Sequence, residues 1–356
     1  INAPFYKPPE DSEEIQYLKK QRDALGGSIP QRQSIVEAIP IPELNTFKPL
    51  LEGNGDREFS TTMAFVKMIA TILKDKNIGK NVVPIIPDEA RTFGIDPLFR
   101  QYGIYSHAGQ KYDPVDSDQY LYYREDVEGQ ILEEGITEAG AMSSFIAAGM
   151  SHSTQGMHMI PFFIYYSMFG FQRIGDLIWA AADMRVRGFL IGGTAGRTTL
   201  NGEGLQHQDG HSLLQASVVP NVISYDPAFA YEIAVIIQYG MKRMYQDNDD
   251  VIYYLTLENE NYQHPDMPKD SEEGIIKGMY LFKKGEKSDL RVQLFGSGSL
   301  VNEVIKASDI LKNDWGIESD IWSVTSYNEL RKNGEEIYRY NRLHPEIDDK
   351  MPYIYE

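Results

Sequence analysis

The sequence predicts an α/β protein with a mostly parallel sheet, followed by part of a second α/β domain. Short apolar runs alternate with longer helical patterns, which is the order expected of βαβ units. The apolar runs contain few polar residues, which indicates strands that are buried on both faces. A chain of 356 residues is also long enough for two domains of ordinary size.

A short helix is predicted at residues 13–25 of the N-terminal stretch. The first helix of the α/β pattern is expected after Ser60, because Ser60 can cap a helix that places Phe65 and Ile69 on one face. The strands and helices that follow alternate along the chain. Strands are predicted at residues 82–86, 160–165, 188–191, 222–225 and 251–257, and helices at 137–149, 171–185 and 228–245. Ligands of such sheets bind beyond the carboxyl ends of the strands, so the polar clusters after these strands are candidate sites.

A charged, proline-containing stretch at residues 264–273 separates this pattern from a second one. The second pattern predicts a strand at 292–295, a helix at 300–312 and a strand at 321–324. The polar, proline-rich N-terminal stretch cannot build a core of its own. Because the chain begins with Ile1 and not Met, we expect it to have been cut from a longer protein.

Composition excludes several classes of protein. The 34 basic and 52 acidic residues give a net charge of −18, which disfavours nucleic acids and anionic membranes as partners. The absence of cysteine excludes disulfides and thiolate metal sites and is compatible with the cytoplasm. The longest strongly apolar stretch, residues 159–171, is too short to span a bilayer.

Two familiar motifs are incomplete. Residues 296–301 begin like a dinucleotide fingerprint but lack its third glycine. His207 and His211 have the spacing of a zinc-protease helix, but Gln208 stands where that motif has Glu, and nearby glycines favour a loop. Neither motif is therefore interpreted as a nucleotide or metal site.

The glycine-rich segment 192–211 is the most unusual part of the sequence. It contains six glycines among twenty residues, so its backbone can approach a ligand closely. It also carries acid, base and cationic side chains: Arg197, Glu203, His207, Asp209 and His211. A flexible surface loop is the simpler interpretation, but long loops in compact domains are usually functional, so we favour an active-site loop.

Glu138 and the aromatic cluster at residues 165–171 each allow two interpretations. Glu138 fits a solvated first turn of a helix, where the helix dipole favours an acid, but the apolar residues after it indicate a buried helix. The aromatic side chains fit ordinary core packing. At the end of a strand they could equally stack on a flat heterocycle.

Four runs, residues 87–94, 129–138, 164–176 and 188–211, closely resemble the pyruvate dehydrogenase component of the bacterial pyruvate dehydrogenase complex, of the homodimeric type. This family belongs to the transketolase-like superfamily. The resemblance implies a domain that binds the aminopyrimidine ring of thiamine diphosphate. It also implies oxidative decarboxylation of pyruvate with reductive acetylation of the lipoyl group of the acyltransferase component.

The resemblance assigns roles to individual residues. Glu138 matches the glutamate whose carboxyl group hydrogen-bonds a pyrimidine nitrogen and so activates the cofactor. Phe169 resembles the residue stacked on the pyrimidine, with Tyr166 beside it, and Glu89 resembles a second carboxylate near the cofactor.

His207 and Glu203 match residues on the substrate side of the family's site. The imidazole of His207 could hold the pyruvate carboxylate or stabilise the enamine formed after decarboxylation. His207 is also a candidate to protonate the dihydrolipoyl sulfur during acyl transfer. Residues 108–124 resemble a mobile active-site loop, in which Asp116 is the functional position.

The chain departs from the family in one respect. It contains no Gly-Asp-Gly, the run with which thiamine enzymes bind the diphosphate and Mg²⁺. The resemblance therefore implies that these ligands belong to a missing N-terminal domain. We expect residues 1–40 to be the tail of that domain, 41–268 the pyrimidine-binding domain and 269–356 an incomplete C-terminal domain.

In the family each active site forms between the two subunits of a homodimer, so we expect this chain to hold only the pyrimidine half and to be inactive alone. Two alternatives remain open. One is a related 2-oxo-acid dehydrogenase or transketolase-like enzyme. The other is a non-catalytic fragment whose contribution is dimerisation.

Overall fold

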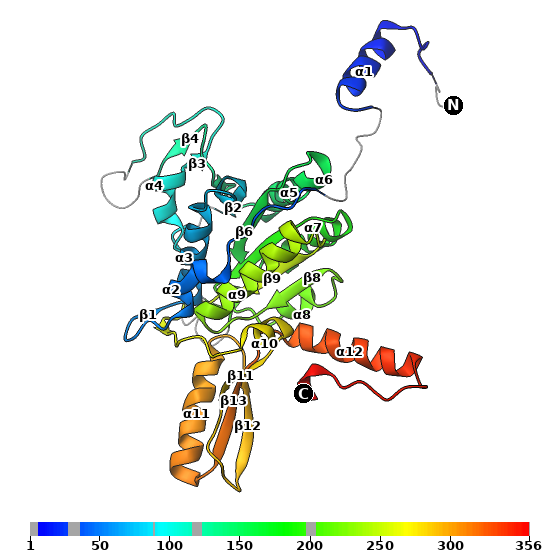
Figure 1. Cartoon of the computed structure of the whole chain (residues 1–356). Coiled ribbons are helices and arrows are strands. Elements are labelled where there is room, and N and C mark those ends of the chain that lie inside the picture. The colour runs from blue at the N-terminus through cyan, green and yellow to red at the C-terminus, as the bar shows by residue number, and fades with distance from the viewer. Residues whose placement is uncertain (1–5, 28–35, 88–89, 116–122, 197–203, 356) are drawn as a thin grey trace.

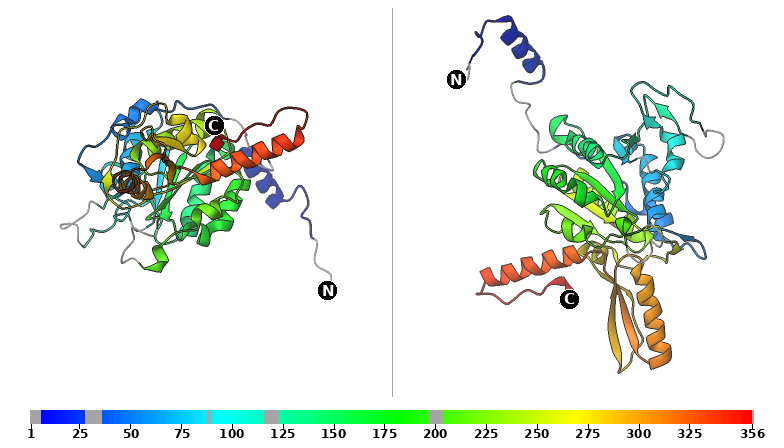
Figure 2. Two further views of the ribbon diagram at one scale, coloured as in Figure 1. Left: turned by 90° about the horizontal axis from the view of Figure 1, so that it is seen from below. Right: turned by 180° about the vertical axis from the view of Figure 1, so that it is seen from behind.

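The computed structural model describes residues 6–27, 36–87, 90–115, 123–196 and 204–355. A central α/β part surrounds a six-stranded sheet, and a smaller C-terminal part with its own sheet projects from it (Figures 1 and 2). The two sheets agree with the predicted α/β class. None of the described helices is long and apolar enough to cross a membrane.

The central sheet has the strand order β5-β2-β6-β7-β9-β8, and all of its strand pairs are parallel. Its strands are β2 (Val82–Ile86), β5 (Leu132–Glu133), β6 (Ile160–Tyr166), β7 (Gly188–Gly193), β8 (Val222–Tyr225) and β9 (Ile252–Thr256). Every residue of β2, β7, β8 and β9 is buried, which confirms the inference from their unbroken apolar runs.

Alternate residues of each strand face opposite layers of helices. Phe162 and Ile164 of β6 join the core formed with α3 (Thr61–Leu73) and α9 (Ala230–Met241). Phe163 and Tyr165 join a second core with α5 (Glu138–Gly149) and α7 (Gly170–Asp183). The sheet is therefore covered on both faces, as its composition requires (Figure 1).

The predicted helices are present with small shifts at their ends. Ser60 caps α3, since its hydroxyl accepts a hydrogen bond from the Met63 N–H at 3.2 Å. The helix predicted at 228–245 is α9 followed by one π-helical turn, Lys242–Gln246.

The C-terminal sheet has the order β11-β13-β12. Its strands are β11 (Tyr280–Lys283), β12 (Arg291–Gly296) and β13 (Glu318–Ser323), and α11 (Leu300–Trp315) covers one face. The parallel pair β12–β13 with α11 between them confirms the second βαβ pattern. The antiparallel strand β11 was not predicted.

The remaining elements are short or peripheral. The helices are α1 (Glu13–Ala24), α2 (Lys48–Leu51), α4 (Phe99–Tyr102), α6 (Ser151–Thr154), α8 (Ser212–Ala216), α10 (Glu272–Lys277) and α12 (Tyr327–Leu343). The strands are β1 (Glu58–Phe59), β3 (Ile104–Tyr105), β4 (Glu125–Asp126) and β10 (Tyr262–Gln263), and 3-10 turns lie at Leu44–Phe47, Gly79–Asn81, Asp96–Leu98, Leu205–His207 and Tyr353–Tyr355.

Buried hydrogen bonds join the central and C-terminal parts. The Glu232 carboxylate of α9 accepts hydrogen bonds from the Tyr280 and Ser323 hydroxyls, both at 2.7 Å. Burial raises the pKa of Glu232, and these two hydrogen bonds oppose that rise. The two parts therefore share a polar contact that is costly to leave unsatisfied.

We expect the buried His264 to make folding stability sensitive to acid. Its Nδ1 accepts a hydrogen bond from the Ala230 N–H at 3.1 Å, and its Nε2 lies 2.8 Å from the Phe59 carbonyl oxygen. This pattern fits the neutral ring with its proton on Nε2. Burial lowers the pKa of His264 to about 4, below its ordinary value of 6.5.

Between pH 6.5 and 4 the unfolded state thus binds more protons at this histidine than the folded state. We expect the free energy of unfolding to fall as pH falls through this window, by up to about 3 kcal/mol from His264. Urea unfolding of the wild type and His264→Gln at several pH values checks this. His344→Gln, at a histidine whose side chain is 43% exposed, is the control, and an unchanged pH slope in His264→Gln would contradict the prediction.

Candidate active site

A cavity of about 210 Å³ opens beside the carboxyl end of β6, next to the N-termini of α5 and α7. This is the edge of a parallel sheet where ligands are expected. Its lining combines one carboxylate, one guanidinium, one imidazole and several aromatic rings: Pro87, Ile136, Thr137, Glu138, Ala141, Phe163, Tyr165, Tyr166, Phe169, Arg173 and His207.

Glu138 is the first residue of α5. Thr137 caps this helix by accepting the Gly140 N–H at 3.3 Å, so the position of Glu138 at the helix start is fixed by its neighbour. Arg173 Nη1 of α7 donates a hydrogen bond to Glu138 Oε1 at 2.5 Å. The Glu138 side chain is 19% exposed, so it is partly withdrawn from water but remains accessible from the cavity.

The aromatic side chains form a flat-walled surface beside this carboxylate. The Tyr166 ring at the end of β6 stacks on the His207 ring, with centroids 4.9 Å apart and an angle of 23°. The Phe169 ring meets the His207 ring edge-on at 5.5 Å and the Tyr166 ring edge-on at 5.9 Å. These three rings can hold a planar group.

Arg173 belongs to this site although sequence reasoning gave it no role. Its guanidinium lies 4.0 Å from the centroid of the Phe169 ring and also binds Glu138. Phe169 and Arg173 are four residues apart at the start of α7, which places them on one face of the helix. That four-residue spacing is the feature of the sequence from which a contact between Phe169 and Arg173 could have been predicted.

Tyr165 also lines the cavity and was interpreted only as part of the aromatic cluster. It is 1% exposed, and its hydroxyl has no hydrogen-bond partner in the part of the chain that the structure describes. Burial raises the pKa of this phenol well above its usual value, so it stays protonated and can donate.

His207 ends a 3-10 turn, and the next part of its loop is fixed by Asp209. Asp209 Oδ1 accepts the N–H groups of His211 and Ser212, both at 3.0 Å, while Oδ2 accepts the Ser212 hydroxyl. The Tyr254 hydroxyl donates to Ser212 Oγ at 2.8 Å. Asp209 was one of the candidate acid/base side chains of the glycine-rich segment. In the structure its carboxylate holds the loop in place.

The structure brings four predicted site residues to one cavity: Glu138, Tyr166, Phe169 and His207. The other three predicted positions, Glu89, Glu203 and Asp116, lie outside the described residues.

Solved structures with a similar fold come from transketolases. The transketolase of Leishmania mexicana has a TM-score of 0.64 at 16% identity, and the match covers 84% of this chain and 38% of that one. The transketolase of Campylobacter jejuni has a TM-score of 0.62 at 16% identity, with 91% and 41% covered. The chain thus has the α/β fold of the transketolase-like class.

Sequence comparison identifies the family. Residues 38–265 match the pyruvate dehydrogenase E1 component middle domain, and residues 278–351 match the transketolase-like C-terminal domain. The chain belongs to the pyruvate dehydrogenase E1 component family.

Two curated relatives illustrate the match. The pyruvate dehydrogenase E1 component of Pseudomonas aeruginosa is 59% identical over 354 residues, and that of Escherichia coli K12 is 55% identical over 353. Each match covers 99% of this chain, which spans 40% of the length of each relative.

Proposed function

We propose that this chain supplies the pyrimidine-binding half of a thiamine diphosphate site in an enzyme that decarboxylates pyruvate oxidatively and acetylates the lipoyl group of an acyltransferase component. The observation that supports this most directly is the convergence of Glu138, Tyr166, Phe169 and His207 on one cavity. Membership of the pyruvate dehydrogenase E1 component family supports the choice of reaction.

The residues present fit the aminopyrimidine ring of thiamine diphosphate. The walls of the cavity are largely aromatic, which suits a flat heterocycle, and the lining includes the Glu138 carboxylate, which can bind a ring nitrogen. When bound, the cofactor supplies a thiazolium carbon that acts as the nucleophile toward 2-oxo acids. The donor set therefore matches the ring, although among the described residues that line the cavity there is no cluster of cations for a diphosphate.

Glu138 holds a proton at the ring nitrogen in this proposal. In the described part of the chain its hydrogen bond to Arg173 is made through Oε1, which leaves Oε2 to face the ring. Arg173 orients the carboxylate, and its contact with Phe169 keeps the guanidinium in place. Glu89 is proposed as a second carboxylate near the cofactor.

The substrate side is assigned to the loop that carries His207. His207 is proposed to bind the pyruvate carboxylate and to deliver a proton to the dihydrolipoyl sulfur, and Glu203 is proposed as a second substrate-side residue. Asp116, in the segment 108–124, is proposed as a further functional residue of the same site. The stacking of His207 on Tyr166 supports this assignment because it directs the imidazole into the cavity.

The wider organisation is also proposed. Residues 1–40 are the tail of an N-terminal diphosphate-binding domain that supplies the Mg²⁺ ligands, residues 41–268 the pyrimidine-binding domain and 269–356 part of the C-terminal domain. The intact protein is a cytoplasmic homodimer. The absence of Gly-Asp-Gly from these 356 residues favours a second function for the isolated chain, a dimerisation unit without catalysis.

A direct test compares the intact protein with the isolated 356-residue chain. The intact protein should reduce ferricyanide in the presence of pyruvate, thiamine diphosphate and Mg²⁺. The isolated chain should show no turnover and no tight, Mg²⁺-dependent binding of thiamine diphosphate by calorimetry. Turnover by the isolated chain would contradict the half-site proposal. A preference of the intact protein for 2-oxoglutarate or a ketose phosphate would favour the related enzymes instead.

A further inference from the structure

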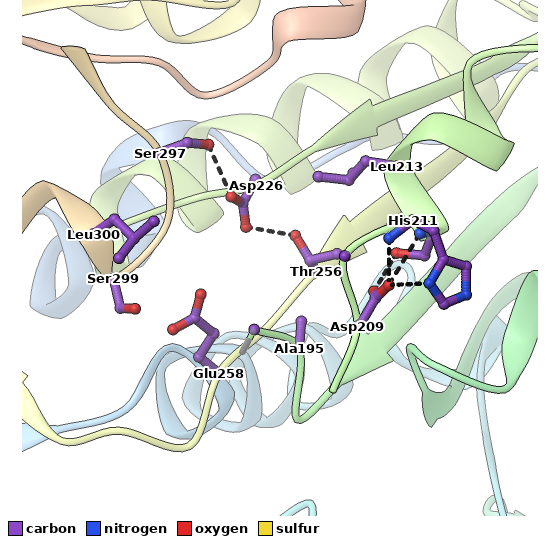
Figure 3. A pocket seen from close by; sticks show the side chains of 13 residues that line it. Ala195, Asp209, His211, Leu213, Asp226, Thr256, Glu258, Ser297, Ser299 and Leu300 are labelled. Carbon is purple, nitrogen blue, oxygen red and sulfur yellow. Dashed lines mark hydrogen bonds and ion pairs between the residues drawn. The ribbon is translucent and has the colours of Figure 1, made fainter. Parts of the chain in front are cut away.

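A second, larger cavity lies between the central and C-terminal parts. Its volume is about 310 Å³, and its lining comes from the carboxyl ends of β7, β8 and β9 on one side and of β12 on the other (Figure 3). The carboxyl ends of parallel strands from two sheets thus meet around one space, which is a place where ligands are commonly bound.

The ionisable side chains of this cavity are mostly acids. Asp209, Asp226 and Glu258 all line it, and the described lining includes no lysine or arginine. Asp226 accepts hydrogen bonds from the Thr256 hydroxyl at 2.6 Å and from the Ser297 hydroxyl at 2.8 Å. These neutral donors orient Asp226 but do not balance its charge.

Glu258 has a buried carboxylate oxygen that lacks a hydrogen-bond partner among the described residues. It is 7% exposed, and within the described residues its Oε2 has no hydrogen-bond partner. Its backbone is held firmly, since its N–H donates to Thr61 Oγ1 at 2.8 Å and its carbonyl accepts the Thr62 hydroxyl at 2.9 Å. Figure 3 shows its carboxylate directed into the cavity.

Gly298 shows how close the two carboxylates are. A Cβ atom on Gly298 would lie 2.9 Å from both carboxylate oxygens of Asp226 and 2.9 Å from Glu258 Oε1. Because both distances start from the same point, Glu258 Oε1 and the carboxylate oxygens of Asp226 are separated by no more than the sum of the two distances. Burial, reinforced by the charge of Asp226, raises the pKa of Glu258 to about 8, and hydrogen bonds from the side chain and backbone of Ser299 oppose this rise.

We propose that this cavity binds a small organic cation that carries ammonium groups. An ammonium group brings only hydrogen-bond donors and a positive charge, and the cavity offers carboxylate and hydroxyl acceptors for both. A directly coordinated metal is disfavoured, because no group of three or more His, Asp or Glu among the described residues could hold one. The volume also exceeds what a bare ion needs and suits a small molecule.

The probe for the test is 1,4-diaminobutane, titrated calorimetrically into the intact protein at pH 7, with neutral 1,4-butanediol as the isosteric control. The diamine should bind and the diol should not. Glu258→Gln should weaken diamine binding at least about tenfold, whereas Glu303→Gln, which removes an exposed acid of α11, should leave it unchanged. Asp226→Asn reports on the same cavity if Glu258→Gln does not fold.

A second readout is proton release. Because burial raises the pKa of both the Asp226 and the Glu258 carboxyl, and the two lie close together, binding of the diamine should expel a proton from this pair. The apparent binding enthalpy should then depend on the ionisation enthalpy of the buffer for the wild type, and much less for Glu258→Gln. Equal affinity of the wild type and Glu258→Gln for the diamine, or absence of diamine binding, would each overturn the proposal.

Discussion

Replacing Glu138 by alanine in the intact protein is expected to lower the rate of thiazolium C2 proton exchange by about 10²- to 10⁴-fold, the range typical of a lost general acid–base group. The carboxylate stands at the start of α5 and at the wall of the aromatic cavity, where it can hold a proton at a pyrimidine nitrogen. Exchange of the C2 proton with D₂O, followed by ¹H NMR with bound thiamine diphosphate, measures this step directly.

Two comparisons separate a chemical role of Glu138 from a structural one. Asp176→Ala removes an exposed acid from the neighbouring helix α7 and should leave the exchange rate within about twofold of wild type. The affinity of Glu138→Ala for thiamine diphosphate should change far less than its exchange rate, because the ring walls stay in place. Exchange at the wild-type rate in Glu138→Ala would show that another group activates the cofactor.

Much of the central fold was predictable because its signals are local. Strands β2 and β8 are short apolar runs whose ends match the predicted ones. Ser60 is a typical N-cap residue, and its hydroxyl caps α3 by accepting the N–H three residues further along. Strand β5 was missed because it has two residues and no periodicity of its own. Strand β11 was missed because it pairs antiparallel with β13, about forty residues further along the chain.

The candidate active site was predictable at positions where the residue type and its sequence neighbours by themselves indicate a function. Glu138 and His207 stand out by type and context, and the family resemblance gave both a role. Arg173 was harder to recognise because its importance comes from two contacts, with Glu138 and Phe169, that exist only after α5 and α7 pack together.

The acidic cavity could not be derived from sequence. Asp226, Glu258 and Gly298 follow three different strands, and no spacing in the chain indicates that they converge. Their proximity depends on how the C-terminal sheet docks on the central one, which long-range hydrogen bonds such as Asp226 N–H to the Thr325 carbonyl at 2.8 Å help to define. Sequence patterns report periodicity and local caps, and they carry little information on such docking.

Replacing Arg187 is expected to cause a large loss of folding stability. Arg187 immediately precedes β7 and is completely buried. Its guanidinium donates five hydrogen bonds to three residues. They go to Asp250 Oδ1 at 3.0 and 2.7 Å, to the Met244 carbonyl at 3.1 Å, and to the side-chain and carbonyl oxygens of Asn248, both at 2.8 Å. Arg187 thus joins the start of β7 to the segment that leads from α9 into β9.

Arg187→Met keeps much of the side-chain volume but removes all of these donors. The carbonyl oxygens of Met244 and Asn248 and the Asp250 carboxylate then lose their buried partner, so we expect the variant to be destabilised by about 3–5 kcal/mol. In urea unfolding monitored by circular dichroism, this corresponds to a decrease in the midpoint on the order of 1 M.

Arg185→Met is the matched control, because Arg185 reaches the same acid, Asp250, at 3.4 Å from a side chain that is 62% exposed. An exposed ion pair contributes about 0–1 kcal/mol, so this variant should unfold close to the wild-type midpoint. The two variants remove the same functional group, and only Arg187 is enclosed. Equal midpoints for the two variants would therefore show that the buried hydrogen bonds of Arg187 do not stabilise this junction, and that solvent reaches the carbonyl groups once the guanidinium is gone.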